Sequence, residues 1–160
     1  KQLELFDSGL LPERMRQRRA EANGLTIYEM VRDPNLYPLE KYLDLADLAL
    51  DRDPKHIEQF SELMNDPDEG VRYWAICGLF LLDDPTKPAS QVIQDAIQDD
   101  CTEVQMMAAW SMHRHGEVEK ANAIFEQVKR NPQHDKPFLE SIHRWKDAKH
   151  PSNTKPSVNH

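Results

Sequence analysis

Residues 66–84 read DPDEGVRYWAICGLFLLDD, and this stretch contains ten consecutive uncharged residues, from Tyr73 to Leu82. The run is too short to cross a membrane, which takes about 20 apolar residues. A helix on the surface of a globular protein would carry polar side chains along one face. A segment without a polar face therefore predicts a helix that other helices cover on more than one side.

Composition favours a single all-helical domain. The chain has 160 residues, of which 39% are hydrophobic and 30% charged, and only five are glycine. This profile differs from that of a β-sandwich or of a disordered chain. Asp-Pro or Asn-Pro pairs at 33–34, 53–54, 66–67, 84–85 and 131–132 place prolines in expected turns. These turns separate successive helices.

A second stretch repeats the first at a constant spacing along the chain. Residues 99–115, DDCTEVQMMAAWSMHRH, align with residues 66–82, and the aligned pairs are Val71 with Val104, Ala75 with Ala108, Gly78 with Ser111, and Leu79 with Met112. The spacing from Val71 to Val104 is here called the repeat offset. It also relates the helices expected before these two stretches, where Phe60 aligns with Ile93, Leu63 with Ala96 and Met64 with Ile97. Two such units predict an array of helical repeats, in which each inner helix packs on its neighbours.

The apolar residues of the first unit divide into two stripes. The first stripe comprises Val71, Ala75, Gly78, Leu79 and Leu82, with Trp74 at its edge, and the second comprises Tyr73, Cys77 and Phe80. Gly78 costs about 1 kcal/mol of helix propensity relative to alanine, which predicts that a neighbouring helix approaches closely there. A third pair of helices is expected in residues 117–147, with Ile124, Phe125 and Val128 on one and Phe138, Leu139, Ile142 and Trp145 on the other.

At residues 63–82, LMNDPDEGVRYWAICGLFLL, the chain resembles a HEAT-type repeat. The resemblance is carried by Asp66, Pro67, Val71, Arg72, Ala75 and Leu79. It implies a short right-handed α-α superhelix in which Arg72 pairs with turn carboxylates of adjoining repeats, with Asp66 and Asp68 as the candidates here. Gln105 stands where the second unit would carry the arginine, so the ladder of pairs is expected to be interrupted. A tetratricopeptide arrangement of the C-terminal part, indicated by Gly116, Ala121 and Phe125, is the alternative.

A wider resemblance covers roughly residues 3–115. Segments Gly9–Glu13, Tyr28–Met30 and Tyr37–Glu40 precede the repeats in the same order as in the region that follows the catalytic domain of a set of bacterial sulfatases. The resemblance implies a parent enzyme of the alkaline-phosphatase superfamily, which hydrolyses sulfate esters with a calcium ion and a formylglycine nucleophile, in the periplasm or outside the cell. The chain would then be a non-catalytic accessory region that packs on, or modulates, that covalently linked domain.

No residue of this chain is expected to be catalytic or to bind a metal or cofactor. The family forms formylglycine within Cys/Ser-x-Pro-x-Arg, and neither Cys77 nor Cys101 lies in such a sequence. Cys77 is expected to be buried and Cys101 to lie at a turn or N-cap, and whether they form a disulfide stays open. The histidines show no metal-ligand spacing, and phosphate-loop and dinucleotide-binding motifs are absent from the sequence.

Charge is distributed unevenly over the net −8. Residues 1–32 sum to +1, residues 33–103 to −12 and residues 104–160 to +3. The acidic middle argues against nucleic-acid binding, and the length of the apolar run argues against membrane insertion. The basic cluster Arg14, Arg16, Arg18 and Arg19 is interpreted as a solvated helix face.

Three segments are expected. Residues 1–32 form a helical connector to an upstream domain, residues 33–147 the solenoid and residues 148–160 a disordered tail. The connector helix would open at Pro12 and close at Asn23-Gly24. Because the chain starts at Lys1 rather than Met, we expect it to be part of a larger protein. The alternatives to an accessory region of a sulfatase are a free-standing scaffold that binds a protein partner and a carbohydrate-binding module. The residues expected to be exposed for interaction are Tyr37, Trp145, Arg16 and Arg19.

Overall fold

The computed structural model describes residues 10–82 and 87–130. Its elements are α2 (Glu13–Ala22), α3 (Ile27–Met30), α4 (Leu39–Leu50), the short 3-10 helix η1 (Pro54–His56), α5 (Ile57–Leu63), α6 (Glu69–Leu81), α7 (Lys87–Ala96), α8 (Thr102–Arg114) and α9 (Val118–Lys129). No strand occurs in these residues, which confirms the all-α class. The expected disordered tail and the helix predicted from Phe138 to Trp145 lie outside the described residues.

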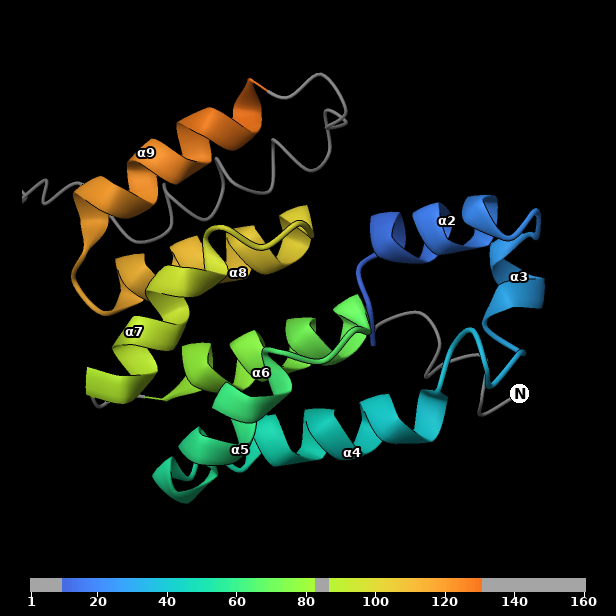
Figure 1. Ribbon diagram of the computed structural model, residues 1–160, viewed down its shortest axis with the longest axis horizontal. Helices are drawn as coiled ribbons and strands as arrows, with labels where there is room; N and C mark the ends of the chain where they lie inside the picture. Colours follow the sequence, from blue (N-terminus) through green and yellow to red (C-terminus); the bar gives the residue numbers. More distant parts are fainter. Residues whose placement is uncertain (1–9, 83–86, 131–160) are drawn as a thin grey trace, which may run out of the picture.

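The helices form a layer with two further helices against it. In Figure 1, α4, α6, α8 and α9 follow one another side by side, while α5 packs on α6 and α7 packs on α8. Helices α2 and α3 lie at the end of the layer where α6 and α8 begin. Within the described ranges, none of the helices combines the length and the apolar composition that a membrane crossing requires.

Helix α6 is the sandwiched helix that its uncharged sequence predicts. It packs on α4, α5, α7 and α8. The first apolar stripe is buried throughout, with Val71, Ala75 and Leu79 completely inaccessible to solvent. The second stripe is more open, because Cys77 is buried whereas Tyr73 and Phe80 are only partly covered.

The repeat offset found in the sequence is kept in three dimensions. Both α6 and α8 have 13 residues, and their first and last residues are related by this offset. The turns before them are also alike, because the Asp66 carboxylate accepts a hydrogen bond from the Asp68 N–H at 2.8 Å, and Asp99 accepts one from Cys101 at 2.9 Å. Two consecutive units of one design are therefore present, and Cys101 is the N-cap residue that its position predicts.

The connector helix α2 begins and ends where its sequence predicts. Pro12 precedes its first residue, and Gly24, just beyond its end, has a φ of +64°, a conformation that glycine adopts readily. Four apolar residues of this segment, Leu10, Leu11, Met15 and Ala20, are buried, whereas Leu25 and Ile27 are partly buried. On α9, the first helix of the expected third pair, Phe125 and Val128 are buried and Ile124 is partly buried.

Candidate functional site

An open cleft of about 750 Å³ lies between α2 and the beginnings of α6 and α8. Polar residues dominate its walls. The lining residues come from α2 (Arg18, Arg19, Ala22), from the segment before α4 (Asn35, Leu36), from the start of α6 (Pro67, Asp68, Glu69, Arg72) and from the start of α8 (Asp100, Thr102). Three arginines and several carboxylates therefore meet here from parts of the chain that are distant in sequence.

Arg72 links the two repeat units. Its Nε and Nη2 atoms donate to the Asp99 carboxylate at 3.0 and 3.1 Å, Nη2 also donates to Asp100 at 2.8 Å, and Nη1 donates to the carbonyl oxygen of Asp66 at 2.9 Å. The expectation that Asp66 or Asp68 supplies its carboxylate partner is wrong. The carboxylates of those two residues are engaged elsewhere, and the turn before α8 presents Asp99 and Asp100 to Arg72 instead.

Gln105, the counterpart of Arg72 in the second unit, keeps the hydrogen bond to its own turn but not the ion pair. Its side-chain amide donates to the carbonyl oxygen of Asp99, the residue that corresponds to Asp66 in the first unit. A glutamine thus supports the backbone of its own turn but carries no charge with which to pair a carboxylate of the next turn. The ladder of ion pairs stops at Gln105, as the sequence predicts, while the hydrogen bond to the turn continues.

We expect Arg72→Gln to lower the free energy of unfolding by about 2 kcal/mol. The glutamine retains the bond to the Asp66 carbonyl but leaves Asp99, whose side chain is only 9% exposed, without its cation. Chemical denaturation followed by circular dichroism measures the change. Lys55→Gln, at an exposed ion pair with Asp53, is the matched control and should cost much less, because exposed ion pairs contribute little to stability. Equal losses in the two variants would contradict a structural role for the Arg72 pairs.

Arg19 is enclosed rather than exposed, so the expectation that it is free for interaction is wrong. Its Nη1 donates to the carbonyl oxygen of Leu36 at 2.8 Å and to the Tyr42 hydroxyl at 2.7 Å, and its Nη2 donates to Asp68 at 2.9 Å. The Tyr42 hydroxyl in turn donates to Asp68 at 2.6 Å. Burial and the bond to Asp68 raise the pKa of Tyr42, so this phenol stays protonated as the donor.

Arg18 crosses the cleft to both units. It donates to Glu103 of α8 at 3.0 Å and to Glu69 of α6 at 3.3 Å. Glu103 is only 5% exposed. Burial by itself would raise the pKa of Glu103, but the Arg18 guanidinium outweighs that effect and holds the pKa below its ordinary value. The interpretation of the basic cluster as a solvated face is therefore incomplete, because the partly exposed Arg18 and the enclosed Arg19 also hold α2 to the array.

Glu103→Gln should remove a pH-dependent part of the stability. Because the folded-state pKa of Glu103 is depressed, its contribution is complete above the unfolded pKa of about 4.3 and is lost as the pH falls through the folded pKa. We expect the variant to be about 1–2 kcal/mol less stable at pH 7 and to lose less stability than the wild type from pH 5 to pH 3. Denaturation curves across that range measure this. In Glu119→Gln, an exposed control, the wild-type pH dependence should persist, and the same persistence in Glu103→Gln would contradict the prediction.

Tyr37, Arg16 and Trp145 are the other residues expected to be exposed. Tyr37 is only 1% exposed, so the expectation that it is exposed for interaction is wrong. The turn at Asp33, whose carbonyl accepts a hydrogen bond from the Tyr37 N–H at 2.8 Å, directs the ring onto Tyr42 with 5.1 Å between ring centroids. Arg16 is partly buried, and Trp145 lies outside the described residues.

Neither cysteine is prepared for chemistry. Cys77 and Cys101 are both buried and unbridged, which answers the open question about a disulfide. Burial raises the pKa of the Cys77 thiol to about 12, and burial together with the neighbouring Glu103 also raises that of Cys101. The thiolate is the nucleophilic form, so both side chains are held in the unreactive thiol form. The Cys101 thiol also donates to the Glu103 carboxylate at 3.3 Å.

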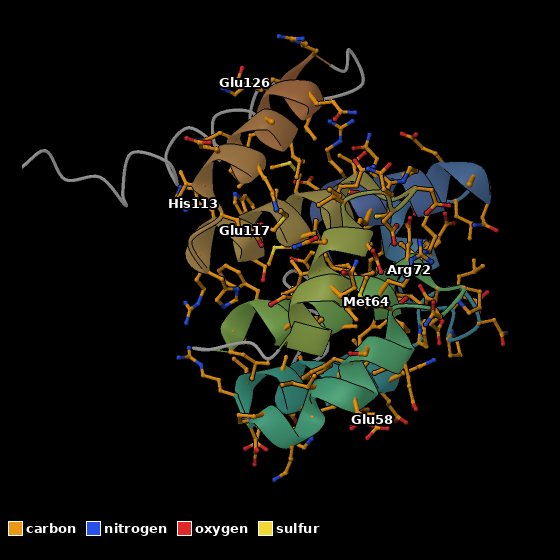
Figure 2. All side chains as sticks on the ribbon, turned by 60° about the vertical axis from the view of Figure 1, so that its left-hand side comes forward. Glu58, Met64, Arg72, His113, Glu117 and Glu126 are labelled. Carbon is orange, nitrogen blue, oxygen red and sulfur yellow. The ribbon has the colours of Figure 1, made fainter. Side chains whose placement is uncertain are left out.

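Figure 2 places the network within the molecule. Arg72 lies among the polar side chains near the blue α2–α3 region, whereas Glu58 and Glu126 lie at the periphery, away from this group.

Elsewhere in the described ranges, the side chains of Asp51, Asp53 and His56 lie together on the turn after α4, with their potential metal-ligand atoms within 4.8 Å of one another. Asp51 already contacts His56 at 2.9 Å and Asp53 contacts Lys55 at 2.7 Å, so the chain's own groups engage these carboxylates.

Comparison of the chain with protein-family models, with curated proteins and with solved structures found no match. The residues that matter most in the cleft were also missed by sequence reasoning. Tyr42, Glu69 and Glu103 belong to no motif, and nothing in the basic cluster that contains Arg18 indicates which acidic residues it meets.

Proposed function

We propose that this chain is a non-catalytic helical module that holds a neighbouring domain or protein in place. The observation that carries the proposal is the mutual neutralisation of the charged groups in the cleft. Arg18 pairs with Glu69 and Glu103, Arg19 with Asp68, and Arg72 with Asp99 and Asp100. Catalytic sites depend on an acid, base or nucleophile that is available for reaction, whereas these side chains are used to join helices.

A HEAT-like superhelix is the architecture we propose for this module. Its support is the repeat offset that relates α6 to α8, the common conformation of their turns, and the arginine that joins one turn to the next. In such arrays each unit contacts only its neighbours, so stability and shape depend on the joints between units. The joint made by Arg72 is of this kind.

We further propose that the module follows the catalytic domain of a sulfatase. The support is the order of the three segments before the repeats, together with what their residues do. Leu11, Met30 and Tyr37, one from each segment, are all buried. Each segment therefore contributes a residue to the packing of this part of the chain, alongside exposed residues such as Glu13, Tyr28 and Glu40. Calcium and formylglycine belong to the proposed upstream domain, and the periplasm or the cell exterior is the proposed location.

Sequencing the coding DNA upstream of Lys1 tests this assignment. We expect a Cys/Ser-x-Pro-x-Arg motif in the same reading frame, far enough upstream to belong to a separate catalytic domain. A start codon close to Lys1 would overturn the sulfatase proposal. The remaining candidate would then be a free-standing scaffold, for which the open cleft beside α2 offers a concave surface.

A further inference from the structure

Helices α2 and α3 form an arm, residues 13–30, that is set apart from the array. Helix α2 packs principally on α3, and the cleft of about 750 Å³ separates α2 from the beginnings of α6 and α8. In Figure 1 this arm occupies one end of the molecule, beside the helix starts and outside the layer of α4, α6, α8 and α9. Met15, Ala20 and Met30 of the arm are nevertheless buried in the same core cluster as the residues of the array, so apolar contacts and the charged groups of the cleft both join the arm to it.

Two consecutive arginines span the cleft between the arm and the array. Arg18 reaches Glu69 and Glu103, which are 51 and 85 residues away in sequence, and Arg19 reaches Asp68, 49 residues away. The side chain of Arg18 is 46% exposed and that of Arg19 is 15% exposed. Water therefore has access to at least the Arg18 pairs, which weakens them relative to pairs in a dry core.

The acidic partners of Arg18 and Arg19 also have stabilising interactions that do not involve these arginines. Asp68 caps α6 by accepting a hydrogen bond from the Gly70 N–H at 2.8 Å, and Glu69 and Glu103 lie in the first turns of α6 and α8. Negative charge at the beginning of a helix is stabilised by the helix dipole. Release of the arm would leave these carboxylates at favourable positions, which lowers the cost of breaking the pairs.

We propose that the α2–α3 arm is a strap that closes on the array through Arg18 and Arg19 and opens when these pairs are lost. The movement would take place in the segment between α3 and α4, residues 31–38. Opening would change the direction in which the chain enters at Leu10 and hence the position of any domain joined there. The proposal concerns this chain's own contacts and does not depend on the sulfatase assignment.

Amide hydrogen exchange, measured by mass spectrometry on the 160-residue chain, tests the strap. In the double variant Arg18→Gln/Arg19→Gln we expect exchange in residues 13–30 to accelerate at least tenfold, while residues 69–81 and 102–114 change less than twofold. The control Arg52→Gln/Arg130→Gln removes the same charge from two exposed arginines and should leave exchange in the arm unchanged.

A salt series on the wild type gives a second readout that needs no substitution. Since salt screens solvent-accessible charges, raising the sodium chloride concentration should accelerate exchange in residues 13–30 in the wild type but not in the double variant. Unchanged exchange in the arm, in the variant and in salt, would show that the buried apolar residues Leu10, Leu11, Met15 and Met30 hold it and would overturn the proposal. Equal acceleration in the arm, α6 and α8 would also overturn it, because the arm would then unfold with the array.

Discussion

Gly78→Ser should lower the free energy of unfolding by about 3 kcal/mol, at the upper end of the usual cost of overpacking a core. A Cβ atom at Gly78 would lie 2.4 Å from the ring of Phe60. That ring is 1% exposed and belongs to the core, so it has little room to move. Chemical denaturation measures the loss, which should exceed the modest gain in helix propensity that serine brings over glycine.

The second repeat supplies the compensating change. At the repeat offset, Phe60 corresponds to Ile93 and Gly78 to Ser111, and Ile93 and Ser111 are buried like their counterparts. In the second unit, a smaller side chain on α7, Ile93, thus accompanies a larger one on α8, Ser111. Phe60→Ile alone should cost about 1–2 kcal/mol through the space it leaves.

The double variant Phe60→Ile/Gly78→Ser should therefore be more stable than Gly78→Ser alone. The two substitutions concern side chains in direct contact, where coupling energies of about 0.5–3 kcal/mol are usual, and we expect a value near the top of this range. Additive losses would show that the clash at Gly78 is not with Phe60. Ala89→Ser, at a buried position of α7, is a control that should show no coupling to Phe60→Ile.

The sequence predicts the repeat units well, because their determinants are local. Apolar periodicity, the small residue at Gly78 and the Asp-Pro turn each act within a few residues, and α6, α8 and the buried stripe follow from them. The helix of the connector is predicted for the same reason, since Pro12 and Gly24 mark its limits.

The cleft is not predicted, because its determinants are pairings over long sequence distances. Nothing in the local pattern distinguishes Glu103, the buried partner of Arg18, from the other acidic residues of the chain. Arg72 reaches a carboxylate 27 residues away, in the following turn. The burial of Tyr37 depends in the same way on Tyr42, which approaches it only after the turn before α4 has formed.

Asp68→Ala should cost about 3–4 kcal/mol, because one carboxylate serves three partners. Its Oδ1 atom accepts from the Gly70 N–H at 2.8 Å and from Arg19 at 2.9 Å, and its Oδ2 atom accepts from the Tyr42 hydroxyl at 2.6 Å. Loss of an N-cap alone costs about 1 kcal/mol. The variant also leaves the guanidinium of Arg19, only 15% exposed, without its carboxylate, and breaking such an enclosed pair is more costly than losing an exposed one.

Asp68→Asn separates these contributions. The asparagine oxygen at the Oδ1 position can still cap α6 and accept from Arg19, but the amide nitrogen at the Oδ2 position cannot accept from the Tyr42 hydroxyl. The variant therefore loses the charge that faces Arg19 and the bond from Tyr42 but keeps the cap, and we expect a cost of about 2–3 kcal/mol, below that of Asp68→Ala. Denaturation of both variants, with Asp47→Ala at an exposed position of α4 as the control, measures the difference. The control should lie within about 0.5 kcal/mol of the wild type. If Asp68→Ala and Asp68→Asn were equally destabilised, the charge on Asp68 and its bond from Tyr42 would account for the whole effect, and the cap on α6 would contribute nothing.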